Sequence, residues 1–224
     1  MFSINFEREE NQMQKVIILF GKPGAGKGTR LGKFLEGKEN LFEVLSVGNL
    51  LRKALKEQTE LGKKAESYMN SGGLVPDEII NALIIDAIRN ADKPIITDGY
   101  PRTVGQAKAM LDAGIFPYNV IELYVDDEVV LERAKARIVC SNCGEPYTTN
   151  DFKPPKAHGI CDKCGGALVR RKDDAENVVK ERLKVYQEQT YPVVEFLYDK
   201  GIEIHTINNS SPDSQEKFAR LLTD

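Results

Sequence analysis

No apolar run in the sequence approaches the ~20 residues that a membrane-spanning helix needs. The longest one near the N-terminus is 16–20, and the polar stretch before it does not resemble a secretory signal. Neither sign of charge dominates, because 31 Lys and Arg stand against 34 Asp and Glu. A general binder of nucleic acid would carry a basic excess. We therefore expect neither a membrane nor a nucleic acid as the main partner.

Cysteines are also few, and their placement is uneven. All four stand in two close pairs between Cys140 and Cys164, which favours a cytoplasmic metal site over extracellular disulfides. A chain of 224 residues corresponds to one domain with small inserts, and it can bury enough surface to fold without disulfides. With 41% hydrophobic and 29% charged residues, disorder is excluded. We expect a cytoplasmic monomer, with residues 1–15 as an N-terminal tail.

Short apolar runs alternate with segments of helical pattern along the chain. Strands are expected over 16–20, 94–98, 120–125 and 202–207. Helices are expected over 29–36, 49–70, 79–88, 103–113, 127–136, 176–199 with a break near Pro192, and 213–222. Asp77, just before one of these helices, is expected to cap it or to charge its start. The alternation predicts an α/β fold, a doubly wound parallel sheet covered on both faces.

Two segments interrupt this alternation. A helical stretch without a strand covers 46–75, and a stretch rich in Cys, Pro, Gly and Asn covers 137–174. We interpret both as inserts at the carboxyl edge of the sheet, where open α/β sheets bind ligands. The core then comprises 16–45, 76–136 and 175–224.

The strongest local motif follows the first apolar run. Residues 21–29 read Gly-Lys-Pro-Gly-Ala-Gly-Lys-Gly-Thr. Glycines between a strand and a helix let the backbone wrap around phosphate oxygens, and the helix N-terminus points its amides at the anion. Lys27 adds a positive charge towards the β and γ phosphates of a nucleotide. The hydroxyl comes one residue later than in the general motif, at Thr29. The alternative, a glycine turn with a solvated lysine, does not need this strand–helix context.

Further segments resemble motifs of the nucleoside monophosphate kinases. They read Ser-Val-Gly-Asn-Leu-Leu-Arg at 46–52, Gly-Gly-Leu-Val-Pro-Asp-Glu at 72–78, Asp-Gly-Tyr-Pro-Arg-Thr at 98–103 and Arg-Lys-Asp-Asp at 171–174. The resemblance runs from Val16 to about Leu222. The long cysteine-containing insert is similar to that of the zinc-lidded, bacterial-type adenylate kinases. The fold implied is a P-loop sheet with an AMP-binding insert at 46–75 and a zinc-binding lid at 137–174.

The resemblance also implies a reaction, the reversible transfer of the terminal phosphate of ATP to AMP with Mg²⁺, giving two ADP. Such a transfer needs alignment and neutralisation of spreading charge, which guanidinium groups supply well. Taken singly, an arginine is more often a solvated residue on a helix face. By resemblance, Arg52 and Arg102 hold the AMP phosphate, and Arg133 stacks on the ATP adenine. The implied catalytic residues are Lys27, Asp98, Arg102, Arg137, Arg171 and Arg182.

The binding residues are carried over in the same way. Asp98, at the end of an apolar strand, is expected to orient Mg²⁺ through waters, and the alternative is a strand-end cap. Gln106 resembles the residue that reads the AMP adenine, since an amide offers both a donor and an acceptor. The implied ATP-binding residues are Gly24, Ala25, Gly26, Lys27, Gly28, Thr29, Arg133, Arg137, Pro146, Tyr147 and Ser211. The implied AMP-binding residues are Val47, Arg52, Gly73, Leu74, Val75, Gly99, Tyr100, Pro101, Arg102, Gln106, Arg171 and Arg182.

The two cysteine pairs, Cys140 with Cys143 and Cys161 with Cys164, have the spacing of a tetrahedral zinc site. Four thiolates would close the coordination shell, so the zinc is expected to be structural rather than catalytic. Disulfides or free thiols are the alternatives. We expect His158, between the pairs, to be a loop residue. Tyr147 has an alternative as well, an exposed hairpin tyrosine.

Some positions depart from the family pattern. Val47 stands where adenylate kinases usually have Thr, and Asn49 where they have Asp. Ile138 replaces the second Arg of a common pair, and residues 208–212 replace a Gly-containing turn near the ATP adenine. We expect weakened AMP binding that the double substitution Val47→Thr with Asn49→Asp restores. The alternative functions are a kinase of the same fold using UMP, CMP or GTP, a zinc-ribbon nucleic-acid-binding protein with a nucleotide switch, and a hydrolytic P-loop ATPase.

Overall fold

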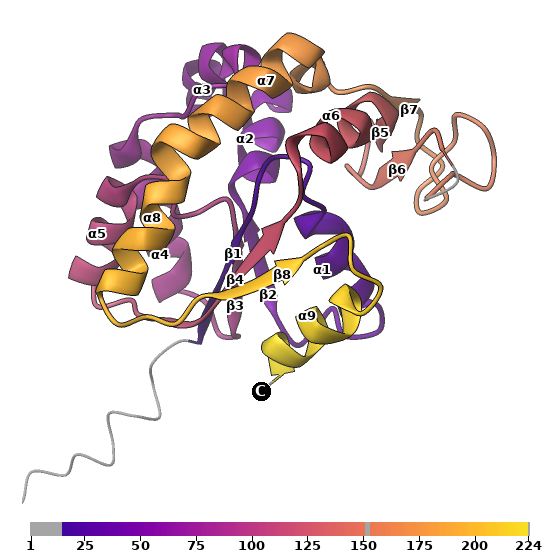
Figure 1. Cartoon of the computed structure of the whole chain (residues 1–224). Coiled ribbons are helices and arrows are strands. Elements are labelled where there is room, and N and C mark those ends of the chain that lie inside the picture. Colours follow the sequence, from indigo (N-terminus) through magenta and orange to yellow (C-terminus); the bar gives the residue numbers. More distant parts are fainter. Residues whose placement is uncertain (1–14, 151–152, 224) are drawn as a thin grey trace, which may run out of the picture.

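The computed structural model describes residues 15–150 and 153–223, so residues 1–14 of the expected tail lie outside the described residues. Its central feature is a five-stranded sheet in which every neighbouring pair of strands is parallel. The strands, in spatial order, are β2 (Glu43–Ser46), β3 (Ile95–Asp98), β1 (Val16–Phe20), β4 (Pro117–Tyr124) and β8 (His205–Asn208). This confirms the predicted doubly wound parallel sheet (Figure 1).

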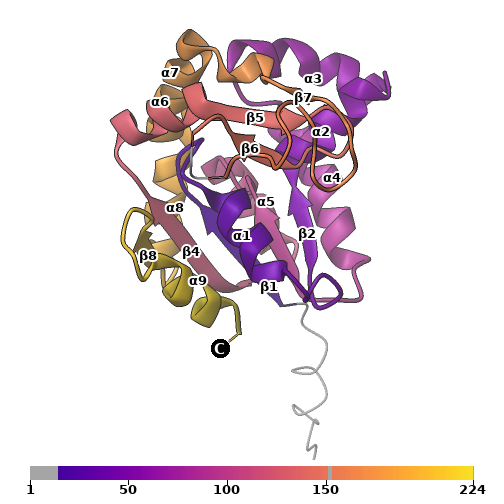
Figure 2. The same cartoon turned by 90° about the vertical axis from the view of Figure 1, so that its right-hand side faces the viewer.

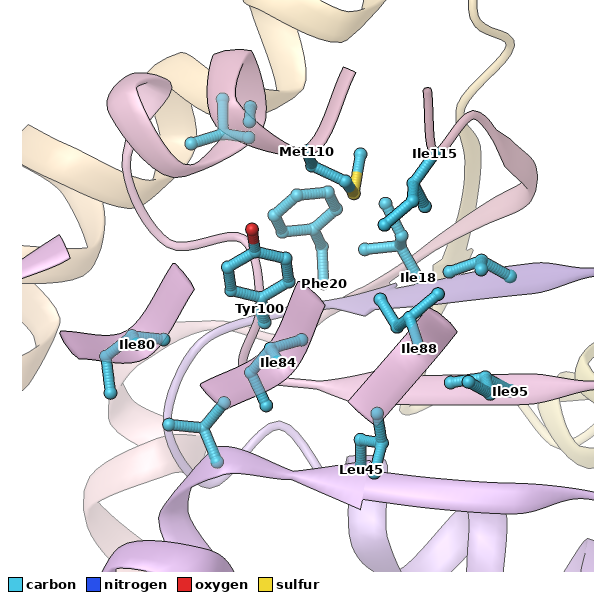
Figure 3. Close-up of a cluster of buried hydrophobic side chains, with 14 of the residues drawn as sticks. Ile18, Phe20, Leu45, Ile80, Ile84, Ile88, Ile95, Tyr100, Met110 and Ile115 are labelled. Atoms are coloured by element: carbon cyan, nitrogen blue, oxygen red, sulfur yellow. The ribbon is translucent and has the colours of Figure 1, made fainter. Parts of the chain in front are cut away.

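Helices cover both faces of this sheet, which explains why β1 is an unbroken apolar run. Successive side chains of a strand point to opposite faces, and here both faces are buried. Val16, Ile18 and Phe20 belong to one core cluster, shown in Figure 3. That cluster includes residues of α4 (Asp77–Arg89), α5 (Val104–Asp112) and α8 (Tyr191–Asp199). Ile17 and Leu19 belong to a second cluster, with residues of α1 (Lys27–Leu35), α6 (Asp127–Ala136), α7 (Glu176–Val185) and α9 (Ser214–Thr223).

Some element bounds differ from the sequence-based expectation, and β4 begins at Pro117 rather than at residue 120. Strand β2 was not expected, because it is only four residues long and lies directly before α2. Its first two residues are exposed. The last strand is β8 at His205–Asn208, shifted towards the C-terminus from 202–207. The break expected near Pro192 in the helix over 176–199 is confirmed, and it takes the form of a π-helical turn at Tyr186–Thr190. Pro192 lacks an N–H donor for the preceding turn, so the irregular turn comes before the proline rather than after it.

Both inserts lie beyond the carboxyl ends of the parallel strands. Helices α2 (Val47–Lys56) and α3 (Glu60–Ser71) pack on each other on one side. On the other side is a small antiparallel sheet of β5 (Arg137–Cys140), β6 (Pro146–Thr148) and β7 (Leu168–Val169). Figure 2 shows this small sheet on the same side of the molecule as α2 and α3. The two inserts are linked by a hydrogen bond from Lys56 Nζ to the Ser141 carbonyl at 3.3 Å and by an ion pair between Arg52 and Asp173 at 3.6 Å.

Throughout the described part of the chain, no helix combines the length and the apolar character needed to cross a membrane.

Candidate active site

The glycine-rich segment joins β1 to α1, as predicted. Gly26 has a φ of 94°, a left-handed conformation that favours glycine, and it directly precedes the helix. A Cβ at Gly26 would lie 2.6 Å from Asn209 Nδ2, so a side chain here would also displace Asn209. The loop therefore presents backbone amides at the N-terminus of α1, an arrangement suited to binding phosphate.

Lys27 is the first residue of α1 and is held inside the loop. Its Nζ donates to the carbonyls of Gly21 at 2.6 Å and Lys22 at 3.3 Å, and it lies 3.9 Å from Asp98 Oδ1. Burial lowers the pKa of Lys27 to about 8, with the nearby Asp98 opposing that shift. Because burial destabilises the charged form of this ammonium group, an incoming anion would stabilise it.

Cations line a large cleft that begins at this loop. Among the described residues, nine Lys and Arg side chains and only three carboxylates line its cavity of about 620 Å³. The whole chain has a net charge of −3, so positive charge is concentrated here. The cations are Lys27, Arg30, Arg52, Arg102, Arg133, Arg137, Lys153, Arg171 and Arg182. A cavity of this size and sign fits an anionic ligand such as a nucleotide.

Three of these arginines are held by two consecutive aspartates, Asp173 and Asp174. Asp173 Oδ2 accepts from Arg182 at 3.0 Å and lies 3.6 Å from Arg52. Asp174 forms a two-pronged ion pair with Arg137. Arg171 is different, because its Nε is buried without a hydrogen-bond partner in the described structure. Burial and then Arg52 lower the pKa of Arg171 to about 10. An unsatisfied buried donor on a guanidinium group is best paired by an anion.

A smaller pocket opens off the cleft between the first insert and the core. Its lining includes apolar side chains, the backbone around residue 73 and three arginines. Gln106, from α5, brings an amide to it. The sequence-predicted residues gathered here are Val47, Arg52, Gly73, Leu74, Val75, Gly99, Arg102, Gln106 and Arg182. An apolar pocket with one amide and several guanidinium groups suits a base that carries a phosphate.

Not every residue implied by the resemblance faces these cavities. Tyr100 is fully buried in the core, where its hydroxyl donates to Asn81 at 2.9 Å. Ala25 is also buried, and its carbonyl accepts from Arg133 at 3.2 Å. Ser211 is absent from the lining of both cavities, and its hydroxyl donates to Asp213. Pro101, Pro146 and Arg171 line the large cleft, together with Gly24, Gly26, Gly28 and Thr29.

The four cysteines converge at one end of the small sheet. Their Sγ atoms all lie within 4.8 Å of one another, with Cys140 and Cys164 at 3.4 Å. Tetrahedral zinc with bonds of about 2.3 Å separates its sulfurs by roughly 3.8 Å, so the cluster fits the metal. A Cβ at Gly166 would lie 2.9 Å from Cys140 Sγ, as expected for a tight metal-binding turn. None of the four forms a disulfide.

Tyr147 supports this cluster. It is 3% exposed, its hydroxyl lies 3.4 Å from Cys161 Sγ, and it accepts from the Asp162 amide at 2.8 Å. The alternative of an exposed hairpin tyrosine is therefore wrong. Its hydroxyl serves the cysteine cluster, although the residue also lines the large cleft.

Comparison with known proteins identifies the family of this chain. The family model described as adenylate kinase matches residues 19–202. Adenylate kinase from Caldicellulosiruptor saccharolyticus is 42% identical over 200 residues, covering 85% of this chain and 90% of that protein. The chain belongs to the adenylate kinase family. The enzymes named adenylate kinase from Geotalea daltonii and Methanosarcina barkeri are both 43% identical, each over 92% of this chain and over 98% and 95% of their own lengths.

Adenylate kinases are phosphotransferases that act on nucleoside monophosphates, so the family fits a cleft with two connected cavities lined by arginines. Several lining residues were not among the predicted site residues, and two of them, Arg30 and Asn209, form a network. Arg30 Nε donates to Asn209 Oδ1 at 2.6 Å, and Asn209 Nδ2 donates to the carbonyl of Ala25. This buried network ties the adenylate kinase phosphate loop to the segment after β8. The position of Arg30, three residues after Lys27 on one helix, was the available signal.

Proposed function

We propose that the protein catalyses the reversible, Mg²⁺-dependent transfer of the terminal phosphate of ATP to AMP, giving two ADP. The observation that carries this proposal is the meeting of Lys27 and the arginines in one cleft, between a phosphate loop and a smaller pocket lined by apolar side chains and Gln106. ATP would bind along the loop and under the lid at 137–174. AMP would bind against the insert at 46–75. Closure over both would exclude the water that otherwise hydrolyses ATP.

The donor side uses backbone amides and cations. Residues 24–29 would hold the ATP phosphates, with Lys27 on the β and γ phosphates and Arg133 on the adenine. Arg137, Arg171 and Arg182 would stabilise the charge that spreads over the phosphoryl group during transfer. Pro146, Tyr147 and Ser211 stay predictions for the donor nucleoside. No general base is required, since one phosphate oxygen attacks another phosphorus directly.

Magnesium fits the same place. Asp98 ends β3 beside Lys27, and its Oδ2 accepts from Ser46 Oγ at 3.3 Å. Thr29, which carries a hydroxyl, lines the same cleft. These are the oxygen donors that Mg²⁺ prefers, with water completing the shell. Bound with ATP, the ion would neutralise charge on the phosphates.

On the acceptor side, Arg52 and Arg102 would hold the AMP phosphate, and Gln106 would read the adenine. Asn49 Oδ1 accepts from Arg52 at 2.7 Å, so this residue acts on the pocket through an arginine of its own helix. Val47 is 5% exposed and lines the pocket without offering a polar group. Of the two substitutions expected to restore AMP binding, we therefore expect Val47→Thr to account for the gain in affinity.

Val47→Thr should lower the KM for AMP by up to ~10-fold, since a restored hydrogen bond contributes about 0.5–1.5 kcal/mol. The KM for ATP should stay unchanged. Steady-state kinetics with each nucleotide varied in turn measures both. Val44→Thr, on exposed β2, is the matched control and should change neither. An unchanged KM for AMP in Val47→Thr would show that this side chain does not face the base.

We further propose that Cys140, Cys143, Cys161 and Cys164 hold a structural zinc. Cys161→Ser, or chelation, should lower the melting temperature by about 5 °C or more, because metal binding is coupled to folding of the lid. Zinc re-added after chelation should restore wild-type stability but not that of Cys161→Ser. Atomic absorption should find one zinc per chain. Protein that contains no metal and is insensitive to chelators would contradict the proposal.

A coupled assay with ATP or GTP as donor, and AMP, UMP, CMP or GMP as acceptor, tests the proposed function. ATP with AMP should be the fastest pair. Faster turnover with UMP or CMP, or with GTP as donor, would identify a different kinase of the same fold. Phosphate release without any acceptor would identify an ATPase, and tight binding of RNA or DNA on filters would favour the nucleic-acid alternative. Cytoplasmic location and a monomeric state stay predictions of the sequence.

A further inference from the structure

The side-chain amide of Gln106 is held from both of its ends. Gln106 lies in the first turn of α5, is 2% exposed and lines the acceptor pocket. Its Oε1 accepts from the backbone N–H of Arg102 at 2.7 Å. Its Nε2 donates to Asp77 Oδ1 at 2.8 Å. The amide therefore has one fixed donor and one fixed acceptor partner before any nucleotide binds.

Asp77 is itself held in place. It is the first residue of α4, and its Oδ2 accepts from the Thr103 hydroxyl at 2.6 Å. It does not cap its own helix, because the residue at the N-cap position is Pro76 and makes no side-chain capping bond. A Cβ at Gly105 would lie 2.7 Å from Asp77 Oδ2. A side chain at residue 105 would therefore crowd this carboxylate, which bonds to α5 rather than to its own helix.

These partners forbid the reversed orientation of the amide. Turning the Gln106 amide by half a rotation would place its oxygen against the Asp77 carboxylate and its NH₂ against the Arg102 N–H. A carboxylate only accepts hydrogen bonds and a backbone N–H only donates them, so both contacts would be lost and replaced by repulsion. Buried groups left unpaired in this way are costly. One orientation is therefore fixed, with one N–H and one oxygen lone pair still free.

A fixed donor and acceptor distinguish two kinds of base edge. Adenine presents a ring nitrogen that accepts and an exocyclic amino group that donates. Guanine and hypoxanthine present the reverse, a ring N–H that donates and an exocyclic oxygen that accepts. A free glutamine could serve either edge by turning its amide, but a locked one serves only one of them.

We propose that Asp77 is a positioning residue that locks Gln106 in the orientation matching an amino-purine acceptor, and so sets selectivity against oxo-purines. This inference rests on the proposed use of this pocket for the acceptor nucleotide. It assigns to Asp77 a role in selectivity that a purely structural hydrogen bond between α4 and α5 would not have.

The test compares AMP with inosine monophosphate, which differs from AMP only at the reading edge and adds no group elsewhere on the ring. The wild-type protein should strongly prefer AMP. Asp77→Asn is isosteric and can offer either an oxygen or an NH₂ to Gln106, and the Thr103 hydroxyl can accept or donate to match. We expect the ratio of kcat/KM for AMP over inosine monophosphate to fall at least ~10-fold, the loss of discrimination expected from one charge-assisted hydrogen bond. The ratio should fall because kcat/KM decreases for AMP, while kcat/KM for inosine monophosphate stays unchanged or increases.

The matched control is Asp86→Asn, on the same helix, which removes an exposed carboxylate that also accepts from an amide, that of Asn90 at 3.1 Å. Its ratio should equal that of the wild type. If Asp77→Asn does not fold, as judged by circular dichroism, Asp77→Leu supplies the same test without any hydrogen-bonding group. An equal loss for both nucleotides in the Asp77 variants would overturn the lock, as would a wild type that uses inosine monophosphate as readily as AMP. A wild type inactive on every monophosphate would instead overturn the proposed function.

Discussion

Replacing Lys27 with methionine should lower the rate of phosphoryl transfer about 10²–10³-fold while the fold stays intact, as is typical when one preorganised charge is removed from an active site. The reason lies in its surroundings. Lys27 Nζ is held by two loop carbonyls and lies 3.9 Å from Asp98, at the N-terminus of α1. Methionine keeps the length of the side chain and removes the charge that meets the phosphates. The measurement is kcat with saturating ATP and AMP.

Two further readouts identify the cause of that loss. Lys33→Met, on an exposed position of the same helix, should leave kcat within about twofold of the wild type. In the wild type, ATP affinity should fall as the pH rises past about 8, because the free protein then loses the Lys27 proton that the triphosphate needs. Lys27→Met should lack that pH dependence. A Lys27→Met protein with activity within a few-fold of wild type would remove Lys27 from the proposed mechanism.

Arg102→Ala should raise the KM for AMP about 100-fold and change the KM for ATP by no more than a few-fold, because a buried guanidinium would no longer meet the acceptor phosphate. Arg102 lines the smaller pocket, which is the proposed acceptor site, and its Nε donates to the Gly99 carbonyl at 3.1 Å. Burial, and then Arg182, lower the pKa of Arg102 to about 10, so holding this charge costs stability unless an anion pairs with it. Loss of the arginine should therefore not reduce the melting temperature, as expected of a functional rather than a stabilising residue.

The control for this substitution is Arg89→Ala on α4, an exposed arginine that also donates to one backbone carbonyl, that of Ala113. It should leave both KM values unchanged. Arg102→Lys keeps the charge but not the fork of donors, and it should fall between the wild type and Arg102→Ala. Equal losses for ATP and AMP in Arg102→Ala would mean that the residue does not belong to the acceptor side.

The parallel sheet was predictable because its strands are buried on both faces. A run such as 16–20, apolar at every position and stopped by glycine, fits few other structures. Strand β2 was not predicted because it is four residues long and half exposed. Neither its length nor its hydrophobic pattern distinguishes it from a loop. The break near Pro192 was predicted, but its π-helical form was not, since the sequence shows that a proline disturbs a helix but not how the backbone adjusts.

The candidate site was predictable where its residues stand close together in the sequence and form a local motif. The loop at 21–29 and the two cysteine pairs are local motifs, so their spacing alone indicates their geometry. Asn209 and Asp77 are different, because each acts on a residue from another element. Asn209, just after the edge strand β8, bonds to the phosphate loop, and Asp77 of α4 bonds to Gln106 of the neighbouring helix α5. Such pairings depend on the packing of elements, which periodicity and spacing do not specify.

The most direct test of the account is a product analysis of ATP, AMP and Mg²⁺ by phosphorus NMR or nucleotide chromatography. We predict that two ADP form for each AMP consumed, that no inorganic phosphate appears, that nothing reacts when AMP is left out, and that ADP alone returns ATP and AMP. Release of inorganic phosphate that does not depend on AMP, or no consumption of AMP while another monophosphate is phosphorylated, would contradict it.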